Sequence, residues 1–527
     1  MTRDLTDPSN SPGYLLHTID AEDDDSLHRP DKNDQPFVFC SGRGILNLAT
    51  ISVLLVGLIA LFIAYPIVSH FKNKSHIGPG FNLGGINSSG QVGDMPGMQN
   101  LKDKDTPEDA WTYTGTDGSK YNLIFSDEFN TDGRTFYPGD DAFWEGQDMH
   151  YWATGDLEWY TPDALETKDG KLVITMTKEQ FKGLNYSSGM VTSWNKMCFT
   201  TGYIEVRVSL PGSGAVAGFW PGVWTMGNLG RAGFGATTDG MWPYSYDTCD
   251  LGTFPSQMDK SGNPESSLTD GWTGDKLSNL PGQRASACTC PGSDHPGPNV
   301  KTGRGVPEID VLEGQVERSI SNGEVSQSFQ TAPFNAFVKF DNSSPATTIY
   351  DSSTTHFNSF TGTALQQSLS AVTLTDNNNY DGVGYATYGF EWWSDPKKRD
   401  DGYITWFVNG KPTWTVTAAS LAADPVSGVS QRLIPEEPMY LILNFGMSPS
   451  FEAQDFEHLV FPSQMYIDYV RVYQRKDVKD GVTCNPSSYP TTDYIQKHLN
   501  AYGNANLTSW SGAGYSYPQN SEYDGCS

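Results

Sequence analysis

Short runs of β-branched and aromatic residues recur along the chain from Tyr121 onward, and they constrain its fold more than any other feature. Such residues favour strands, and clusters of turn-forming residues such as Asn409-Gly410 separate the runs. The runs are YNLIFSDEFN, KLVITMTKE, GYIEVRVSLP, YGFEWW, YITWFVNGKPTWTV, MYLILNFGM and MYIDYVRVYQ. No long run with the 3.6-residue period of a helix competes with them, and only DYIQKHLNAY (493–502) could form a short helix. We therefore expect an all-β fold, an antiparallel β-sandwich or jelly roll.

Residues 45–69 are the one strong membrane signal in the sequence. The run ILNLATISVLLVGLIALFIAYPIVS contains no charged residue, and its 25 residues would span roughly 37 Å as a helix. The run is too long, and lies too far from the N-terminus, for a cleaved signal peptide. We therefore predict a single transmembrane helix that acts as a retained signal-anchor.

The orientation of this helix is predicted from features that follow it, because the Lys and Arg counts beside it hardly distinguish its two sides. The N-x-Ser/Thr sequons all lie after the run, at Asn73, Asn87, Asn185, Asn342 and Asn506. So do Cys198, Cys249, Cys288, Cys290, Cys484 and Cys526, an even set that fits a disulfide framework with 15 possible connectivities. Cys40 precedes the run and is expected to be a free cytosolic thiol. The pattern predicts a type II protein of the secretory pathway or plasma membrane, with its bulk lumenal or extracellular.

Composition divides the chain into five segments. Residues 1–44 are polar and Asp-rich and should form a disordered cytosolic tail. The 45–69 anchor leads into a Gly-, Asn-, Ser- and Pro-rich lumenal stem, 70–118. The folded domain is expected over 119–475, and 476–527 is expected to be a C-terminal extension tied to that domain.

The succession of strand-like runs is interrupted at about 227–305, where Gly, Ser, Pro, Asp and Thr are abundant. A long loop without secondary structure is rare unless it is functional or tied down. Cys249, Cys288 and Cys290 lie in this insertion and can tie it down through disulfides. A zinc site made of these cysteines and His295 is the alternative, but an oxidising lumen favours disulfides.

The charge and the aromatic content narrow the class of ligand. A formal net charge of −28 argues against nucleic acid or an anionic membrane surface as a partner. The chain also holds 26 Tyr, 26 Phe and 14 Trp, and sugar rings present apolar C–H faces that can stack on such side chains. A neutral ligand rich in hydroxyl groups therefore fits the composition best.

Three carboxylates crowd the apolar, strand-forming stretch Glu308-Ile309-Asp310-Val311-Leu312-Glu313. In a regular strand Glu308 and Asp310 share one face and Glu313 points to the other, but a bulge across Val311-Leu312 would bring Glu313 back beside them. Carboxylates pushed apart in pKa supply one ionised nucleophile and one protonated acid, as retaining glycoside hydrolysis requires. A solvated charged face and a Ca²⁺ or Mg²⁺ site are the alternatives. We expect no metal and no cofactor.

Other candidate ligand contacts are less specific. Trp220 and Trp224 lie four residues apart in FWPGVW, so they share a strand face and form either a sugar-stacking platform or part of the core. Asn444 is a candidate for hydrogen bonding to substrate hydroxyl groups. Glu128 and Glu205 are weaker candidates, because structural roles fit them better.

Taken together, the motifs resemble those of glycoside hydrolase family 16 over roughly 121–475. The matching segments run in the family's order: FSDEFN (125–130), TGYIEVRVSLP (201–211), FWPGVWTMG (219–227), PEIDVLEG (307–314), YGFEWW (388–393), MYLILNFG (439–446) and IDYVRVYQ (467–474). Within it the chain is most similar to the fungal β-glucan synthesis-associated proteins of the Kre/Skn group. The segments that carry this likeness are GDLEWYTPDAL (155–165), WPYSYDTCDLGTFPSQ (242–257), LPGQRASACTCPGSDHPGP (280–298) and SQSFQTAPFN (326–335).

The resemblance implies a jelly roll with a concave glycan cleft and a retaining mechanism. Glu308 would be the nucleophile, Glu313 the acid/base, and Asp310 a supporting residue that either raises a neighbouring pKa by repulsion or lowers that of Glu308 by donating a hydrogen bond. The implied role is that of a glycosidase or transglycosidase on β-glucan in β-1,6-glucan formation during fungal wall assembly. The alternatives are a non-catalytic scaffold or chaperone that binds glucan within the synthesis machinery, and a lectin-like sandwich.

Overall fold

The computed structural model describes residues 42–64, 100–271 and 274–526, which fall into two separate units. In the N-terminal unit, helix α1 (Gly42–Ile59) continues into the π-helical turn η2 (Ala60–Ala64). The helix therefore starts slightly before the predicted anchor, and its stretch Ile45–Phe62 is long and apolar enough to cross a membrane. The predicted tail up to residue 41, the end of the anchor at 65–69, Cys40, Asn73 and Asn87 lie outside the described residues.

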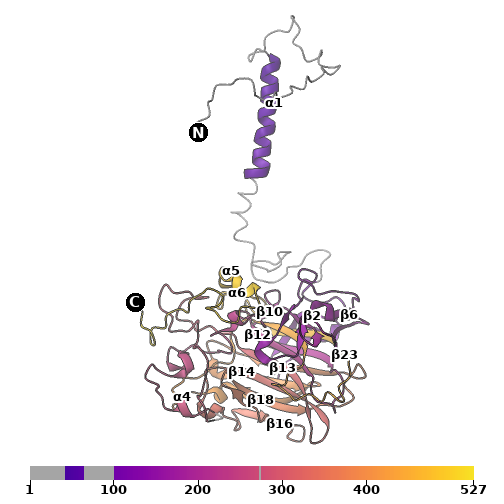
Figure 1. The fold of residues 1–527 in the computed structure, drawn as a ribbon, viewed down its shortest axis with the longest axis vertical. Helices are drawn as coiled ribbons and strands as arrows, with labels where there is room; N and C mark the ends of the chain where they lie inside the picture. Colours follow the sequence, from indigo (N-terminus) through magenta and orange to yellow (C-terminus); the bar gives the residue numbers. More distant parts are fainter. Residues whose placement is uncertain (1–41, 65–99, 272–273, 527) are drawn as a thin grey trace, which may run out of the picture. The chain divides into compact units, whose positions relative to one another are not determined.

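The second unit is built from two large antiparallel sheets, as the strand runs predict (Figure 1). The first sheet has the order β1 (Thr112–Thr114), β2 (Lys120–Asp127), β23 (Ser463–Arg475), β11 (Gly202–Ser209), β19 (Ala386–Trp393), β20 (Tyr403–Val408), β21 (Lys411–Thr417) and β15 (Thr347–Ile349). In addition, β7 (Lys171–Met176) pairs with β23 and with β6 (Leu165–Lys168).

The second sheet has the order β16 (Thr355–Phe357), β18 (Gln366–Leu374), β14 (Asn322–Thr331), β13 (Glu308–Glu317), β12 (Trp220–Gly227), β22 (Met439–Gly446), β9 (Met190–Thr192) and β3 (Glu145–Gly146). Strands β10 (Cys198–Phe199) and β17 (Gly362–Thr363) pair with β22 and β18. Strands β4 (Met149–His150), β5 (Glu158–Tyr160) and β8 (Tyr186–Ser188) form a small third sheet.

The described helices of this unit are short, and several lie in connections. They are η3 (Glu108–Trp111), η4 (Trp152–Thr154), η5 (Pro162–Ala164), α3 (Gly235–Thr238), η6 (Leu251–Thr253), η7 (Pro255–Gln257), α4 (Ser266–Thr269), η8 (Ala336–Val338), η9 (Arg399–Asp401), η10 (Ala418–Leu421), α5 (Thr492–Lys497) and α6 (Leu499–Gly503). The predicted helix at 493–502 is thus present as two short helices, α5 and α6.

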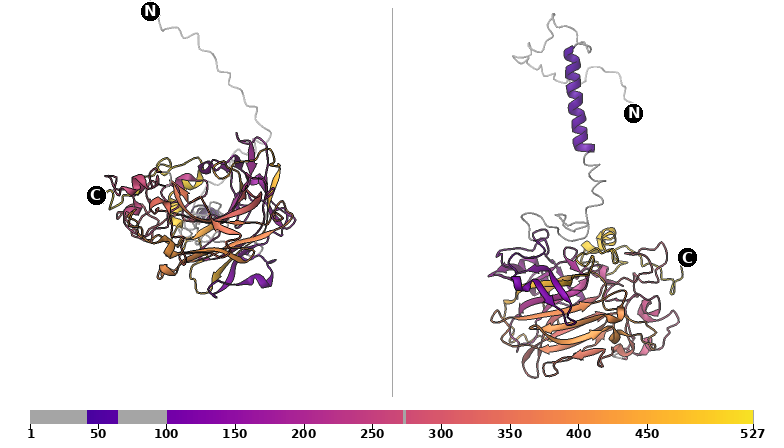
Figure 2. Two further views of the ribbon diagram at one scale, coloured as in Figure 1. Left: turned by 90° about the horizontal axis from the view of Figure 1, so that it is seen from below. Right: turned by 180° about the vertical axis from the view of Figure 1, so that it is seen from behind.

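The main core lies between the two large sheets of the second unit, whose ribbon Figure 2 shows from below and from behind. Val206 and Phe390 of the first sheet and Val223, Leu312 and Leu443 of the second are fully buried in one cluster. Their burial removes apolar surface from water on the inner face of each sheet, which is the dominant stabilising contribution to such a fold. The predicted jelly-roll class is confirmed.

The hairpin between β20 and β21 shows how local sequence sets the register. Its turn residues Asn409 and Gly410 both have positive φ, 51° and 70°. A two-residue turn with this geometry matches the twist of antiparallel strands, and Asn-Gly adopts it at low cost. The turn predicted at this dipeptide is therefore confirmed.

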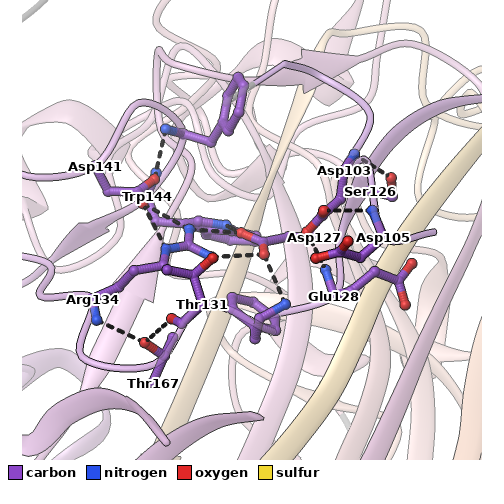
Figure 3. Close-up of polar contacts among 12 residues, drawn as sticks. Asp103, Asp105, Ser126, Asp127, Glu128, Thr131, Arg134, Asp141, Trp144 and Thr167 are labelled. Carbon is purple, nitrogen blue, oxygen red and sulfur yellow. Dashed lines mark hydrogen bonds and ion pairs between the residues drawn. The ribbon is translucent and has the colours of Figure 1, made fainter. Parts of the chain in front are cut away.

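The folded part begins earlier than the predicted stem boundary at 118. The Asp103 carboxylate accepts the backbone N–H of Glu128 at 3.0 Å, and its own backbone N–H donates to the Ser126 hydroxyl at 2.8 Å (Figure 3). Strand β1 also adds to the first sheet, with Thr112 opposite Asn122. Residues 100–118 are therefore part of the domain, a correction to the predicted stem, because they satisfy the exposed edge of β2.

The FSDEFN segment, which the sequence resemblance singled out, has a structural role in this region (Figure 3). The buried Asp127 carboxylate accepts two hydrogen bonds of 2.8 Å from the Arg134 guanidinium and one of 2.9 Å from the Trp144 indole. Arg134 also pairs with Asp141 at 2.7 Å. A buried carboxylate is tolerated only when it is paired in this way, so the network fixes the loop that follows β2.

The six downstream cysteines form three disulfides: Cys198–Cys484, Cys249–Cys288 and Cys290–Cys526. The first joins β10 to the C-terminal extension, and the third joins the insertion to the chain end. A second apolar cluster contains Tyr494 and Tyr502 of this extension together with Met226 of β12. The extension therefore packs directly on one end of the second sheet.

A narrow neck joins the insertion to β13. In this neck, the segment that contains Tyr244 enters the insertion and the segment that contains Gly305 leaves it. The two lie so close that a Cβ on Gly305 would come within 2.0 Å of the Tyr244 backbone oxygen. Arg304 beside it is fully buried and pairs with both carboxylate oxygens of Glu437, at 2.7 and 2.8 Å.

Gly305→Ala is expected to lower the free energy of unfolding by roughly 2–4 kcal/mol, because the added methyl must displace backbone. Gly292→Ala in the same insertion is the control, since Gly292 has positive φ but nothing within 4 Å of its Cβ position, and it should cost about 1 kcal/mol. Denaturant unfolding of the full chain in detergent micelles measures both. Equal losses in the two variants would contradict the tight neck.

Candidate active site

A bulge in β13 places the three predicted carboxylates on one face of the second sheet. In the pairing with β12, Leu312 lies opposite Val223 and Asp310 opposite Trp224, so Val311 has no partner of its own. Strand β14 shows the same shift between Asp310 and Glu313. The extra residue restores Glu313 to the face that Asp310 occupies, which is the effect that the sequence analysis gave for a bulge across Val311-Leu312.

The two outer carboxylates each accept an indole N–H. Trp220 donates to Glu313 at 3.1 Å, and Trp242 donates to Glu308 at 2.8 Å. Glu308 and Glu313 are both half-buried, so each keeps some access to solvent. The Trp220 ring is itself held by a parallel stack on Phe451, with 4.3 Å between ring centres.

The central carboxylate is enclosed by β14. Asp310 is buried and accepts hydrogen bonds from the Ser328 hydroxyl at 2.6 Å and the Gln330 amide at 3.2 Å. The Ser328 hydroxyl also lies 3.3 Å from the Glu313 carboxylate, so it bridges the two acids. Side chains of alternate residues on β14 thus complete the polar layer begun on β13.

Burial and mutual repulsion raise the pKa of all three acids. Burial raises the pKa of Glu308 to about 8, with Glu313 adding repulsion, and burial together with the charge of Asp310 raises the pKa of Glu313 to about 8. Burial and the charge of Glu308 raise the pKa of Asp310 well above its usual range. A hydrogen bond between the Asp310 and Glu308 side chains lowers the pKa of Glu308 and so opposes part of the rise that burial causes. Of the two effects considered for Asp310, this one favours the ionised form of Glu308.

The raised pKa values predict a pH-dependent cost to stability. A carboxyl that binds its proton more tightly in the folded chain loses folding free energy as the pH rises from its unfolded pKa to its folded pKa, here from 4.5 to about 8 for Glu313. Glu313→Gln, which stays neutral, should raise the free energy of unfolding near pH 8 by roughly 1–3 kcal/mol relative to wild type, and should have little effect near pH 4. Unfolding curves at the two pH values test this, and a benefit equal at both would contradict it.

The other predicted contacts form a polar chain beside the acids. Trp224 donates its indole N–H to Asn444 at 2.8 Å, and the Asn444 amide donates to the Tyr160 hydroxyl at 3.1 Å. Tyr160 donates in turn to Asp156 at 3.0 Å. Burial raises the pKa of Asp156 to about 6 and that of its neighbour Glu158 well above the usual range. The Asn444 amide accepts from Trp224 with its oxygen and donates to Tyr160 with its nitrogen, and these two contacts fix its orientation.

Several site residues were missed by sequence reasoning. Trp242 lies 66 residues before Glu308 in the insertion, and nothing in its local pattern points to a carboxylate. Ser328 and Gln330 lie within SQSFQTAPFN, which was noted only for its resemblance; they alternate on β14, so their shared face would have followed from predicting a strand there. Tyr160 lies within GDLEWYTPDAL, a segment noted only for its resemblance.

The weaker candidates have structural roles away from this face. Glu128 forms a buried ion pair with Arg471 at 2.8 Å, and Glu205 accepts hydrogen bonds from Tyr203 and Tyr469 at 2.9 and 2.7 Å. The cysteines of the alternative zinc site are all in disulfides.

The described sequons are accessible. Asn185, Asn342 and Asn506 are exposed in the structure, as acceptors of N-linked glycans must be.

Comparison with known proteins extends these observations. Over residues 14–526 the chain matches the family model described as beta-glucan synthesis-associated protein SKN1/KRE6/Sbg1. It is 42% identical over 522 residues to the beta-glucan synthesis-associated protein KRE6 of Saccharomyces cerevisiae, covering 96% of this chain and 69% of that protein. It is 42% identical over 540 residues to SKN1 of the same yeast, covering 98% and 67%.

Among solved structures, a non-specific endo-β-1,3(4)-glucanase from family GH16 matches with 19% identity and a TM-score of 0.39, over 69% of this chain and 96% of that chain. The extent of the family match and the identity to the yeast proteins show that the chain belongs to the SKN1/KRE6/Sbg1 family of beta-glucan synthesis-associated proteins.

Proposed function

We propose that this protein is a membrane-anchored retaining glycosidase or transglycosidase that acts on β-glucan. The observation that carries the proposal is the β13 bulge, which gathers Glu308, Asp310 and Glu313 on one sheet face with two indole donors. A fold has no structural reason to crowd three acids whose burial raises their pKa. A two-step displacement at a sugar carbon needs such a set.

In the first step, the ionised Glu308 carboxylate attacks the anomeric carbon of the bound glucan. Glu313 gives its proton to the leaving glycosidic oxygen as that bond breaks, which releases one sugar alcohol and leaves a glycosyl ester on Glu308. Asp310, whose pKa is raised well above its usual range by burial and by the charge of Glu308, would donate a hydrogen bond to Glu308 and so favour the ionised form of that half-buried nucleophile.

In the second step, Glu313 is a carboxylate and removes a proton from an incoming hydroxyl group. That oxygen attacks the anomeric carbon and displaces Glu308, which restores the starting protonation of both acids. Water as the incoming group gives hydrolysis, and a sugar hydroxyl gives transfer. The yeast relatives are named as β-glucan synthesis-associated proteins, which supports transfer to a growing glucan chain. We propose β-1,6-glucan as that chain, as the family resemblance of the sequence implies.

The membrane arrangement belongs to the same proposal. The apolar stretch Ile45–Phe62 would anchor the chain, with a cytosolic tail before it and a lumenal stem after it. Exposed sequons and three disulfides in the second unit support a type II orientation, since glycosylation and disulfide formation occur on the lumenal side. The domain from residue 100 onward would then meet glucan in the secretory pathway or at the plasma membrane.

Product analysis tests the proposal. The full chain in detergent micelles is incubated with β-1,3- and β-1,6-linked glucose oligosaccharides, alone and with an isotopically labelled acceptor, and the products are identified by mass spectrometry. Longer products that carry the label are expected for transfer, and shortened products alone would indicate hydrolysis. Saturable binding of the oligosaccharides without any product would contradict the enzymatic function and favour a glucan-binding scaffold.

A further inference from the structure

The insertion brings an indole N–H into the active site. Trp242 Nε1 lies 2.8 Å from Glu308 Oε2, although the two residues are 66 positions apart and Trp242 belongs to no strand of the second sheet. The Trp242 side chain is half-buried and packs, with Tyr151 and Trp224, against the cluster that the C-terminal extension covers. The contact therefore joins the insertion directly to one of the three acids.

The backbone around Trp242 fixes where this N–H lies. Its own N–H donates to the Thr238 carbonyl at 2.9 Å, and the N–H of Val306 donates to the Met241 carbonyl at 2.9 Å. Val306 is two residues before Glu308 on the same segment. Met241 and Glu308 are thus held on neighbouring, hydrogen-bonded stretches of chain, and the indole has little freedom relative to the carboxylate.

Buried contacts further from the site keep the neck in this position. The Arg304 guanidinium pairs with Glu437 just before β22 and also donates to the carbonyls of Gly297 and Pro490, at 2.8 and 2.9 Å. The Cys249–Cys288 disulfide closes the insertion beyond the neck. Because Arg304 is fully buried, its ion pair is protected from solvent screening, and a shift of the neck would break it.

The groups around Glu308 determine how much the hydrogen bond from Trp242 matters for its ionisation. Among the described residues, the titratable groups found to act on Glu308 are Asp310 and Glu313 on its own strand, Tyr151 from the loop after β4, and Tyr440 of β22. All four become neutral or negative, never positive. Burial raises the pKa of Glu308, and the Trp242 hydrogen bond opposes that rise.

We infer that Trp242 is a positioning residue for Glu308: its indole N–H holds the carboxylate in the orientation and in the ionised form from which it attacks. The insertion then contributes a functional side chain to the active site and does not only cover it. The nucleophilic role of Glu308 in this inference rests on the proposed function. The hydrogen bond from Trp242 and its effect on the ionisation of Glu308 can be tested without turnover.

The sharpest variant removes only the N–H. Replacement of Trp242 by 3-benzothienylalanine keeps the size of the indole and substitutes sulfur for N–H, and Trp242→Phe is a second, fully genetic variant. Trp111→Phe is the matched control, because Trp111 is an exposed tryptophan whose indole N–H donates to the Thr106 carbonyl far from the acids in sequence. All proteins are studied as the full chain in detergent micelles.

Two measurements are made across pH 4–10. The first is the pH profile of kcat/KM for oligosaccharide turnover, in which loss of the N–H should move the acid limb up by about one pH unit and lower the rate below it about tenfold, with recovery at higher pH. The second is the rate at which a carbodiimide modifies the Glu308-containing peptide, whose midpoint should move up by the same amount. The Trp111→Phe control should match wild type in both.

Each outcome decides a separate question. A Glu308 midpoint that is identical in wild type and the isosteric variant overturns the inference, as does an activity loss that is equal at every pH. If wild type shows no turnover on any oligosaccharide, the proposed function fails, and the carbodiimide midpoint alone still supports or overturns the role of Trp242.

Discussion

Glu308→Gln is expected to lower glucan turnover about 10⁴-fold or more. The amide cannot attack the anomeric carbon, so no glycosyl ester forms, while its size and its contact with the Trp242 indole are kept. Because Gln is neutral and Glu308 has a pKa raised to about 8, the substitution avoids the cost of ionising this half-buried group, and the variant should fold at least as well as wild type. The measurement is the initial rate of product formation from the oligosaccharide that wild type uses best.

A control on the same strand makes this result specific. Glu317 ends β13 beyond the bulge, and Glu317→Gln causes the same change of charge outside the three acids. It should retain turnover within a factor of about two. Equal rates for wild type and Glu308→Gln would show that Glu308 is not the nucleophile, and equal losses in the two variants would show that the effect is not chemical.

The second large effect is expected for Glu313→Ala. Without its proton donor, cleavage of an ordinary glucan bond should fall about 10³-fold or more, because a sugar alkoxide is a poor leaving group. A β-glucoside with a good leaving group should still form the glycosyl ester, which then accumulates. Azide, which needs no general base, should attack that ester, displace Glu308 and release a glycosyl azide.

The anomer of the azide product distinguishes the two acids. Glu313→Ala retains the nucleophile, so two inversions at the anomeric carbon should give the β-azide. Glu308→Ala lacks the nucleophile, so a single attack by azide should give the α-azide. NMR of the products reads this directly. The opposite pattern would exchange the two assigned roles, and no rescue in either variant would argue against a covalent intermediate.

Periodicity predicted the fold because strands follow from where apolar side chains must go, and the bulge was named only as the condition for gathering the three acids. Ile309, Val311 and Leu312 are all fully buried, and a regular strand cannot direct both Val311 and Leu312 to the core. One extra residue resolves that conflict and returns Glu313 to the site face. The structure supplies the bulge that the sequence analysis required for the three acids to share one face.

Contacts between segments that are distant in the sequence could not be predicted from local sequence. Trp242 reaches Glu308 only through the neck at Gly305, and the partner of each cysteine depends on how the insertion and the C-terminal extension pack. The start of the domain was also set too late, because hydrogen bonds from Asp103 to β2 leave no periodic signal. Long-range packing decided each of these features.

The most direct test of the central claim is to trap the covalent intermediate. A 2-deoxy-2-fluoro-β-glucoside with a good leaving group slows the second step more than the first, so a retaining enzyme accumulates the labelled ester. Peptide mass spectrometry of the full-length protein should find one fluorosugar on Glu308, and none in Glu308→Gln. A label on Glu313, or saturable binding of the reagent with no covalent adduct at all, would contradict the account.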